Sequence, residues 1–157
     1  MWSAVNAVAQ VIAACGVILT LFYLAAQIRQ NTRAIRRSAY QELLNYIANV
    51  NLKLMEDRAM CEISIKVRGG LDQVDEADQM RILVWFGTVF RHYQNAFNLY
   101  REGVISREQW ESMSNPIDRN LSTAGGRDMW RMVRSSFTPM FRELIDERLK
   151  AVAEAED

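Results

Sequence analysis

The sequence predicts an all-α protein with a single N-terminal transmembrane helix that continues into a cytoplasmic helical bundle. No charged side chain precedes Arg29, and the run from Ala4 to Ile28 contains no proline. Further along the chain, apolar residues recur at intervals of three and four, which is the period of an α-helix. No stretch alternates polar and apolar residues for long enough to indicate a strand.

The length and the charge balance limit the possible architectures. The 157 residues suit a membrane anchor, which we place at residues 1–28, and one domain, which we place at residues 29–157. The 19 Lys and Arg residues are balanced by 19 Asp and Glu residues. Since binding to phosphates needs a clustered surplus of basic residues, no nucleic-acid partner is expected.

The uncharged run from Ala4 to Ile28 has the length of a membrane span. A helix of about 20 residues crosses the hydrocarbon core of a bilayer, and an uninterrupted helix bonds all of its own backbone groups. A basic cluster follows directly, at Arg29, Arg33, Arg36 and Arg37. By the positive-inside bias, the N-terminus is periplasmic and the C-terminal domain is cytoplasmic, at a bacterial inner membrane. The same arginines would also attract anionic lipid headgroups.

Cleavage or lipid modification of this run is the alternative to an uncleaved anchor. A secretory signal carries its positive charge before the apolar run, whereas here the charge follows it. The small residues Ala7 and Ala9 precede most of the apolar stretch, so cleavage there would leave the stretch in place. The run Ile12 to Cys15 resembles the box before a lipid-modified cysteine, but many apolar residues follow it. The length favours the uncleaved span.

One face of the predicted span collects its polar residues. Alternating steps of three and four are the period of a left-handed helix seam. We interpret this face as the seam of a homo-oligomer, in which polar side chains bond across helices. The alternatives are polar residues that a long anchor simply tolerates, or the lining of a water-filled pore. The face consists of Asn6, Gln10, Ala13, Val17, Thr20, Leu24 and Gln27.

The first helix is expected to continue past the membrane surface. No proline or glycine occurs between Val17 and Arg68, so nothing stops the helix before about Asp57. An apolar stripe at helical spacing runs along this extension and is expected to face the rest of the domain. The stripe is Ile35, Ala39, Leu43, Ile47, Val50 and Leu54.

Two further helices are predicted before residue 103. A helix near residues 59–68 ends at the pair Gly69 and Gly70, which opens a turn. Asp75 has the position of an N-cap for a helix over residues 76–102, and Gly103 closes that helix. The run from Ile82 to Phe90 is expected to be apolar all round and central to the core.

The last third of the chain predicts three short helices. Ser106 and Gln109 have the spacing of a capping box, and the helix that they open is interrupted or restarted at Pro116. A short helix with Trp130 and Val133 follows a turn at Gly125-Gly126. Pro139 stands at the first position of the last helix. The buried stripe of that helix is Phe141, Leu144, Ile145, Leu149 and Val152.

Three stretches carry a resemblance to a known family. The segments are Tyr23 to Gln41, Tyr100 to Trp110, and Trp130 to Glu147 around Phe137-Thr-Pro-Met-Phe141. They resemble a family of small uncharacterised bacterial membrane proteins with one N-terminal transmembrane helix and a cytoplasmic helical domain. The resemblance implies bacterial origin and a single membrane helix, and no catalytic motif comes with it.

The sequence offers no recognisable catalytic, metal or cofactor set. His92 is the only histidine, and one histidine forms neither a triad nor a dinuclear site by itself. Cys15 and Cys61 lack metal-ligand spacing, and a disulfide is not expected between a cysteine in lipid and one in a reducing cytoplasm. We therefore expect a homo-oligomeric scaffold or interaction module that is not an enzyme. Its partners would be its own copies, membrane lipids and another membrane protein.

Two other classes of function stay open on the sequence alone. The first is a homo-oligomeric channel lined by the polar face of the first helix. The second is a membrane-tethered enzyme that would use His92.

Overall fold

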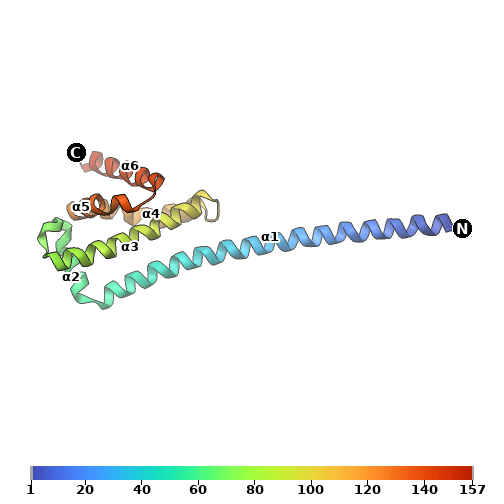
Figure 1. Ribbon diagram of the computed structural model, residues 1–157, viewed down its shortest axis with the longest axis horizontal. Helices are drawn as coiled ribbons and strands as arrows, with labels where there is room; N and C mark the ends of the chain where they lie inside the picture. Colours follow the sequence, from blue (N-terminus) through green and yellow to red (C-terminus); the bar gives the residue numbers. More distant parts are fainter. Residues whose placement is uncertain (1, 157) are drawn as a thin grey trace. The chain divides into compact units, whose positions relative to one another are not determined.

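The computed structural model describes the backbone of residues 2–156, and the side chains of residues 3–5, 7–9, 11–14 and 155–156 lie outside this description. Every element in the described part is a helix, which confirms the prediction of an all-α protein (Figure 1). The elements are α1 (Trp2–Glu56), α2 (Arg58–Lys66), the 3₁₀ helices η1 (Val67–Gly69) and η2 (Leu71–Gln73), α3 (Glu76–Arg101), α4 (Arg107–Leu121), α5 (Ala124–Val133), the 3₁₀ helix η3 (Arg134–Ser136) and α6 (Pro139–Glu156).

The chain forms two compact units, residues 1–39 and residues 40–157. The first unit holds the N-terminal part of α1, in which every large apolar side chain from Val17 to Ile28 is exposed. Within the described part of the chain, none of the helices combines the length and the apolar character that crossing a membrane requires.

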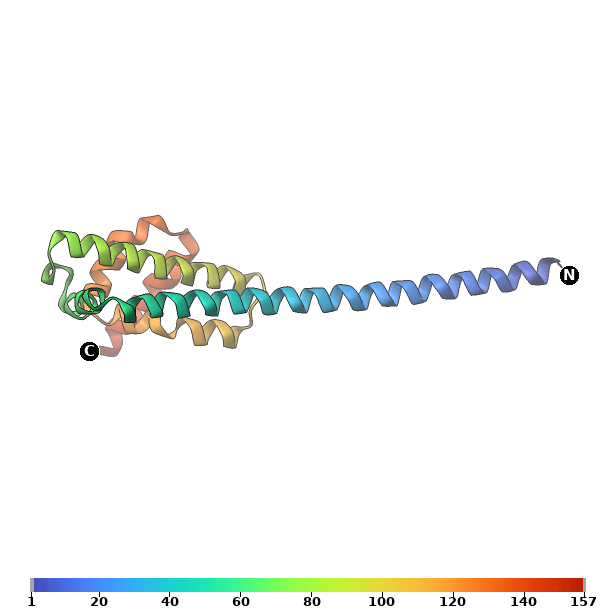
Figure 2. The same ribbon diagram turned by 90° about the horizontal axis from the view of Figure 1, so that it is seen from below.

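The second unit begins with the C-terminal part of α1, which lies beside α3 (Figure 2). Leu43 is buried in this packing, and Ile47 and Val50 are partly buried against the same core. Ile35, at the start of the expected apolar stripe, is exposed. Within the second unit, the C-terminal part of the stripe therefore packs against the core as the sequence predicts.

Side-chain caps set the helix starts that the sequence signals. Asp75 accepts a hydrogen bond from the backbone N–H of Asp78 at 2.9 Å, and this cap begins α3. Ser106 accepts one from the Gln109 N–H at 3.2 Å, while the Gln109 side chain accepts from the Ser106 N–H at 2.8 Å. Both caps confirm the sequence prediction, and Gly103 ends α3 with a φ of 69°.

Aromatic side chains from three helices fill the core. Phe90 on α3 lies 4.1 Å from Phe86 and 5.6 Å from Trp130 on α5, measured between ring centroids. Phe141 on α6 completes the cluster, and all four rings are fully buried. The run from Ile82 to Phe90 lies in the core as predicted, with Ile82, Phe86, Val89 and Phe90 buried. Its apolar character continues on the opposite face of α3, where Val84 is 62% exposed.

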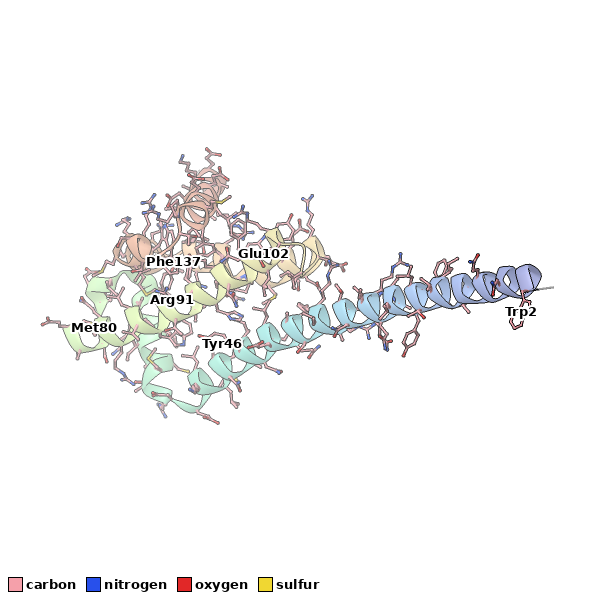
Figure 3. The ribbon with its side chains drawn as sticks, turned by 45° about the vertical axis from the view of Figure 1, so that its right-hand side comes forward. Trp2, Tyr46, Met80, Arg91, Glu102 and Phe137 are labelled. Carbon is pink, nitrogen blue, oxygen red and sulfur yellow. The ribbon has the colours of Figure 1, made fainter. Side chains whose placement is uncertain are left out.

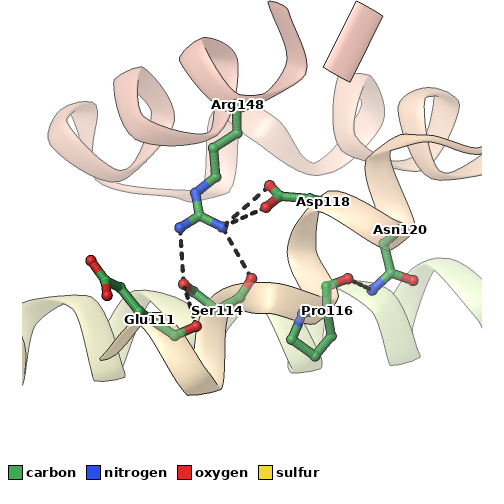
Figure 4. A network of polar contacts seen from close by, with 6 residues as sticks. All are labelled: Glu111, Ser114, Pro116, Asp118, Asn120 and Arg148. Atoms are coloured by element: carbon green, nitrogen blue, oxygen red, sulfur yellow. Dashed lines mark hydrogen bonds and ion pairs between the residues drawn. The ribbon is translucent and has the colours of Figure 1, made fainter. Parts of the chain in front are cut away.

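Helix α4 runs through Pro116, although the sequence predicted a break there. Arg148 of α6 donates to the backbone oxygen of Ser114 at 3.0 Å, to the Ser114 hydroxyl at 2.9 Å and to the Asp118 carboxylate at 3.2 Å (Figure 4). These contacts hold α4 on both sides of the proline. They stabilise a helix that lacks one backbone hydrogen bond, because Pro116 has no N–H to donate.

The pair Gly125-Gly126 lies inside the first turn of α5 and does not form the predicted turn before it. Thr123 caps this helix by accepting a hydrogen bond from the Gly126 N–H at 3.1 Å. A Cβ on Gly125 would lie 1.7 Å from the carbonyl oxygen of Val67, and one on Gly126 would lie 1.8 Å from that of Asn120. The glycines are needed because the backbone of α5 packs directly against two other backbone segments.

We expect Gly125→Ala to destabilise the domain strongly, by about 3 kcal/mol or more, because the new methyl group meets backbone that cannot move aside. Gly87→Ala is the matched control, since its Cβ would lie 3.9 Å from Val133 Cγ1 in ordinary contact. That control should stabilise α3 by about 0.5 to 1 kcal/mol through helix propensity. Thermal unfolding of the full chain, followed by circular dichroism, measures both. Equal effects of the two substitutions would contradict the close approach.

Candidate functional site

The predicted seam lies along one helix, α1. Asn6, Gln10, Val17, Thr20, Leu24 and Gln27 are all exposed, and the side chain of Ala13 lies outside the described residues. On the opposite face, Leu19 is 69% exposed and Phe22 is 71% exposed. Both the seam and the opposite face of this part of α1 therefore carry exposed side chains at these described positions.

The polar groups of the seam differ in their hydrogen bonding. The Thr20 hydroxyl donates to the backbone oxygen of Gly16 at 2.8 Å, and the Gln27 amide donates to the Tyr23 hydroxyl at 2.9 Å. Asn6 and Gln10 make no side-chain hydrogen bond to any described residue. Their amides are therefore available to groups outside the helix.

The basic cluster after the uncharged run is also exposed. Arg29, Arg33, Arg36 and Arg37 have no carboxylate partner among the described residues. Their positive charge is therefore not neutralised within the described chain, and it is free to act on an anionic surface.

His92 is buried, with 8% of its surface exposed, and its ring stacks on Tyr46 of α1 at 4.2 Å between centroids. Within the described residues, His92 Nε2 has no hydrogen-bond partner. Burial lowers the pKa of His92, and a hydrogen bond at the Leu43 backbone partly opposes this shift. The neutral, stacked ring serves as a packing group between α1 and α3.

An open apolar groove lies between the C-terminal part of α1, α2 and α3, with a volume of about 740 Å³. Tyr46 and Met80, both labelled in Figure 3, stand among its lining residues, together with Val84 and Trp85. Met80 and Val84 expose most of their side-chain surface. Exposed apolar surface of this kind is typical of contact sites for other molecules.

The carboxylate of Asp146 links three helical elements of the domain, α5, η3 and α6. Asp146 of α6 accepts from the Trp130 indole N–H at 3.0 Å and pairs with Arg134. The Arg134 guanidinium, aided by the indole, holds the pKa of Asp146 below its usual value. The residues described contain no group of three metal-ligating side chains that could hold an ion.

Comparisons with models of protein families, with curated proteins and with solved structures find no match to this chain.

We expect the stability of the domain to fall as the pH drops below about 6.5, the ordinary pKa of histidine. Because the folded pKa of His92 lies below the unfolded one, the unfolded chain binds the proton first, and protonation favours unfolding. His92→Phe keeps an aromatic ring against Tyr46 but cannot titrate. Denaturant unfolding of both proteins between about pH 5 and pH 8 measures the effect. If the variant loses as much stability at low pH as the wild type, His92 is not the group responsible.

Proposed function

We propose that the chain is a single-pass protein of the bacterial inner membrane, anchored by residues 4–28. The observation that carries the proposal is the absence of charge before Arg29, together with exposed apolar side chains on every side of α1 from Val17 to Ile28. In water such a surface would be a liability for aggregation, whereas lipid would cover it favourably. The uncharged run begins at Ala4, so its full length in the sequence is that of a bilayer span.

The basic residues after the run support one orientation. Four arginines lie within the nine residues from Arg29 to Arg37, and no basic side chain precedes the run. The positive-inside bias places such a flank on the cytoplasmic side. The N-terminus is then periplasmic and the helical domain cytoplasmic.

The function that we propose is a homo-oligomeric scaffold or interaction module. Asn6 and Gln10 support the oligomer, because their unpaired amides would lie in hydrocarbon unless another helix supplies partners. A second copy of α1 in parallel orientation would bring its own Asn6 and Gln10 amides to the same depth in the membrane. The exposed groove at Met80 and Val84 supports an interaction role for the domain.

A channel through the same seam is the second candidate. A pore would place Asn6, Gln10, Thr20 and Gln27 in water, which suits polar side chains. The bonds of Thr20 and Gln27 within α1 favour a packed seam instead, because they remove two of the groups that would bind water or ions. Conductance in planar bilayers that Gln10→Leu abolishes would favour the channel over the scaffold.

We expect the chain to remain in the membrane pellet after alkaline carbonate washing. Leu19→Lys combined with Phe22→Lys should release it, since a lysine at the centre of a span costs about 2.5 to 3.5 kcal/mol. Gln30→Lys combined with Asn31→Lys is the control and should leave the protein in the pellet. Release of the wild type by carbonate would refute the anchor. Protease added to inverted vesicles should digest the domain, and protection from it would refute the orientation.

We expect single cysteines on the seam to cross-link copies of the chain. In a background of Cys15→Ala and Cys61→Ala, Val17→Cys and Leu24→Cys should form disulfide-linked dimers in membranes, because facing seam positions come within disulfide reach. Leu19→Cys and Phe22→Cys on the opposite face are the matched controls. Native mass spectrometry should give one fixed multiple of the chain mass. Equal cross-linking on both faces, or a monomer in the spectrum, would rule out the seam.

A further inference from the structure

A cavity of about 280 Å³ lies inside the second unit, bounded by the C-terminal part of α1 and by α3, α4 and α5, with η1 at one end. Its size is near the lower end of pockets that hold small molecules. Most of its wall is apolar. The apolar residues include Ile47, Val50, Leu54, Val89 and Met129.

Two side chains of this wall carry a polar group that has no hydrogen-bond partner among the described residues. One is the indole N–H of Trp85, which is fully buried, and such buried groups are normally bonded because an unmet hydrogen bond costs about 1 to 3 kcal/mol. The other is the hydroxyl of Tyr93 on α3, a side chain that is 4% exposed and lines the cavity. Burial raises the pKa of Tyr93, and the nearby charge of Arg119 partly opposes that shift. The hydroxyl therefore stays protonated and can donate.

The charge of the cavity has one sign. Arg68 after α2 and Arg119 on α4 both line it, and neither has a carboxylate partner among the described residues. No aspartate or glutamate of the described chain lines the cavity. Elsewhere in the domain some arginines are paired, as Arg134 is with Asp146 and Arg148 with Asp118, while others, such as Arg142, have no carboxylate partner among the described residues. The cavity thus combines apolar walls with two arginines that are exposed to solvent and have no carboxylate partner among the described residues.

We propose that this cavity binds a small organic carboxylate with an apolar body, held by Arg119 and the Tyr93 hydroxyl. Arg68 supplies a second positive charge at the wall. Both guanidinium groups are donors only and match the geometry of a carboxylate, while the aliphatic walls cover the body of the ligand. A neutral apolar molecule would form no ion pair with Arg68 or Arg119. An inorganic anion would make no contact with the apolar side chains of the walls.

The proposal is tested by isothermal titration of the full chain in nanodiscs, with empty nanodiscs subtracted. The probe is 2-naphthoate, its neutral counterpart is 2-naphthylmethanol, and inorganic phosphate tests for a plain anion site. We expect naphthoate to bind at least about tenfold more tightly than the alcohol and than phosphate, which corresponds to about 1.4 kcal/mol. Equal binding of naphthoate and the alcohol would overturn the proposal, as would equal binding of phosphate or no binding of naphthoate.

Variants locate the binding in the cavity. Arg119→Gln should weaken naphthoate at least about tenfold and leave the alcohol unchanged, because it removes the charge and keeps a polar side chain. Tyr93→Phe keeps the ring that packs on Phe90 and should weaken naphthoate several-fold. Arg142→Gln on α6, outside the cavity, is the matched control and should bind as the wild type does. Loss of binding in Arg142→Gln, or none in Arg119→Gln, would overturn the assignment to this cavity.

Discussion

The arrangement of the domain depends on how closely the backbone of α5 approaches η1 and the end of α4. Only glycine at positions 125 and 126 permits this contact, since a methyl group at either position would overlap a carbonyl oxygen of Val67 or Asn120. The approach places the next turn of α5 deep in the domain. Trp130 then reaches Phe90, Phe137 and Phe141 at once, and its indole N–H finds Asp146. One pair of residues without side chains therefore determines where the largest buried side chain lies.

The interior of the domain is packed unevenly on the two sides of α3. On the side of α3 that faces α5 and α6, aromatic rings fill the space and are fully buried. On the side that faces the C-terminal part of α1, only Leu43 of that helix belongs to the fully buried core, while Ile47 and Val50 are partly buried. Packing loosens toward α1, and the cavity lies there. Met129 of α5 lines that cavity. The same helix therefore contributes Trp130 to the densely packed side of α3 and Met129 to the wall of the cavity.

Local signals in the sequence predicted the local structure well. Asp75, Ser106 and Pro139 each act within three or four residues, and each begins a helix where the sequence places one. The ends of two helices also lie where the sequence predicts them, near Asp57 for α1 and at Gly103 for α3. Positions decided by distant contacts were misread. Pro116 and Gly125 look like breaks in the sequence, and they lie inside helices because α6 and η1 pack against them. The cavity was not foreseen, since its lining comes from elements far apart in the chain and no spacing links Tyr93 to Arg68.

Polar groups without partners are the most informative feature of both units. A bonded group such as Thr20, or Asp146 with its indole and guanidinium partners, is accounted for within the chain. Asn6, Gln10 and the Tyr93 hydroxyl have no such partner among the described residues. A polar group without a partner costs free energy wherever its surroundings are apolar, as they would be for Asn6 and Gln10 in the membrane span that we propose. The nature of the partner follows from the surroundings. Asn6 and Gln10 lie in the uncharged run before Arg29, and the partner that we propose for them is another copy of this run, which carries matching amides. In the cavity, the donors are the Tyr93 hydroxyl, the Trp85 indole N–H and the guanidinium groups of Arg68 and Arg119, and no acidic side chain of the described chain lines the wall. A ligand with a negatively charged acceptor suits these donors, whereas a cationic ligand would be repelled by the arginines.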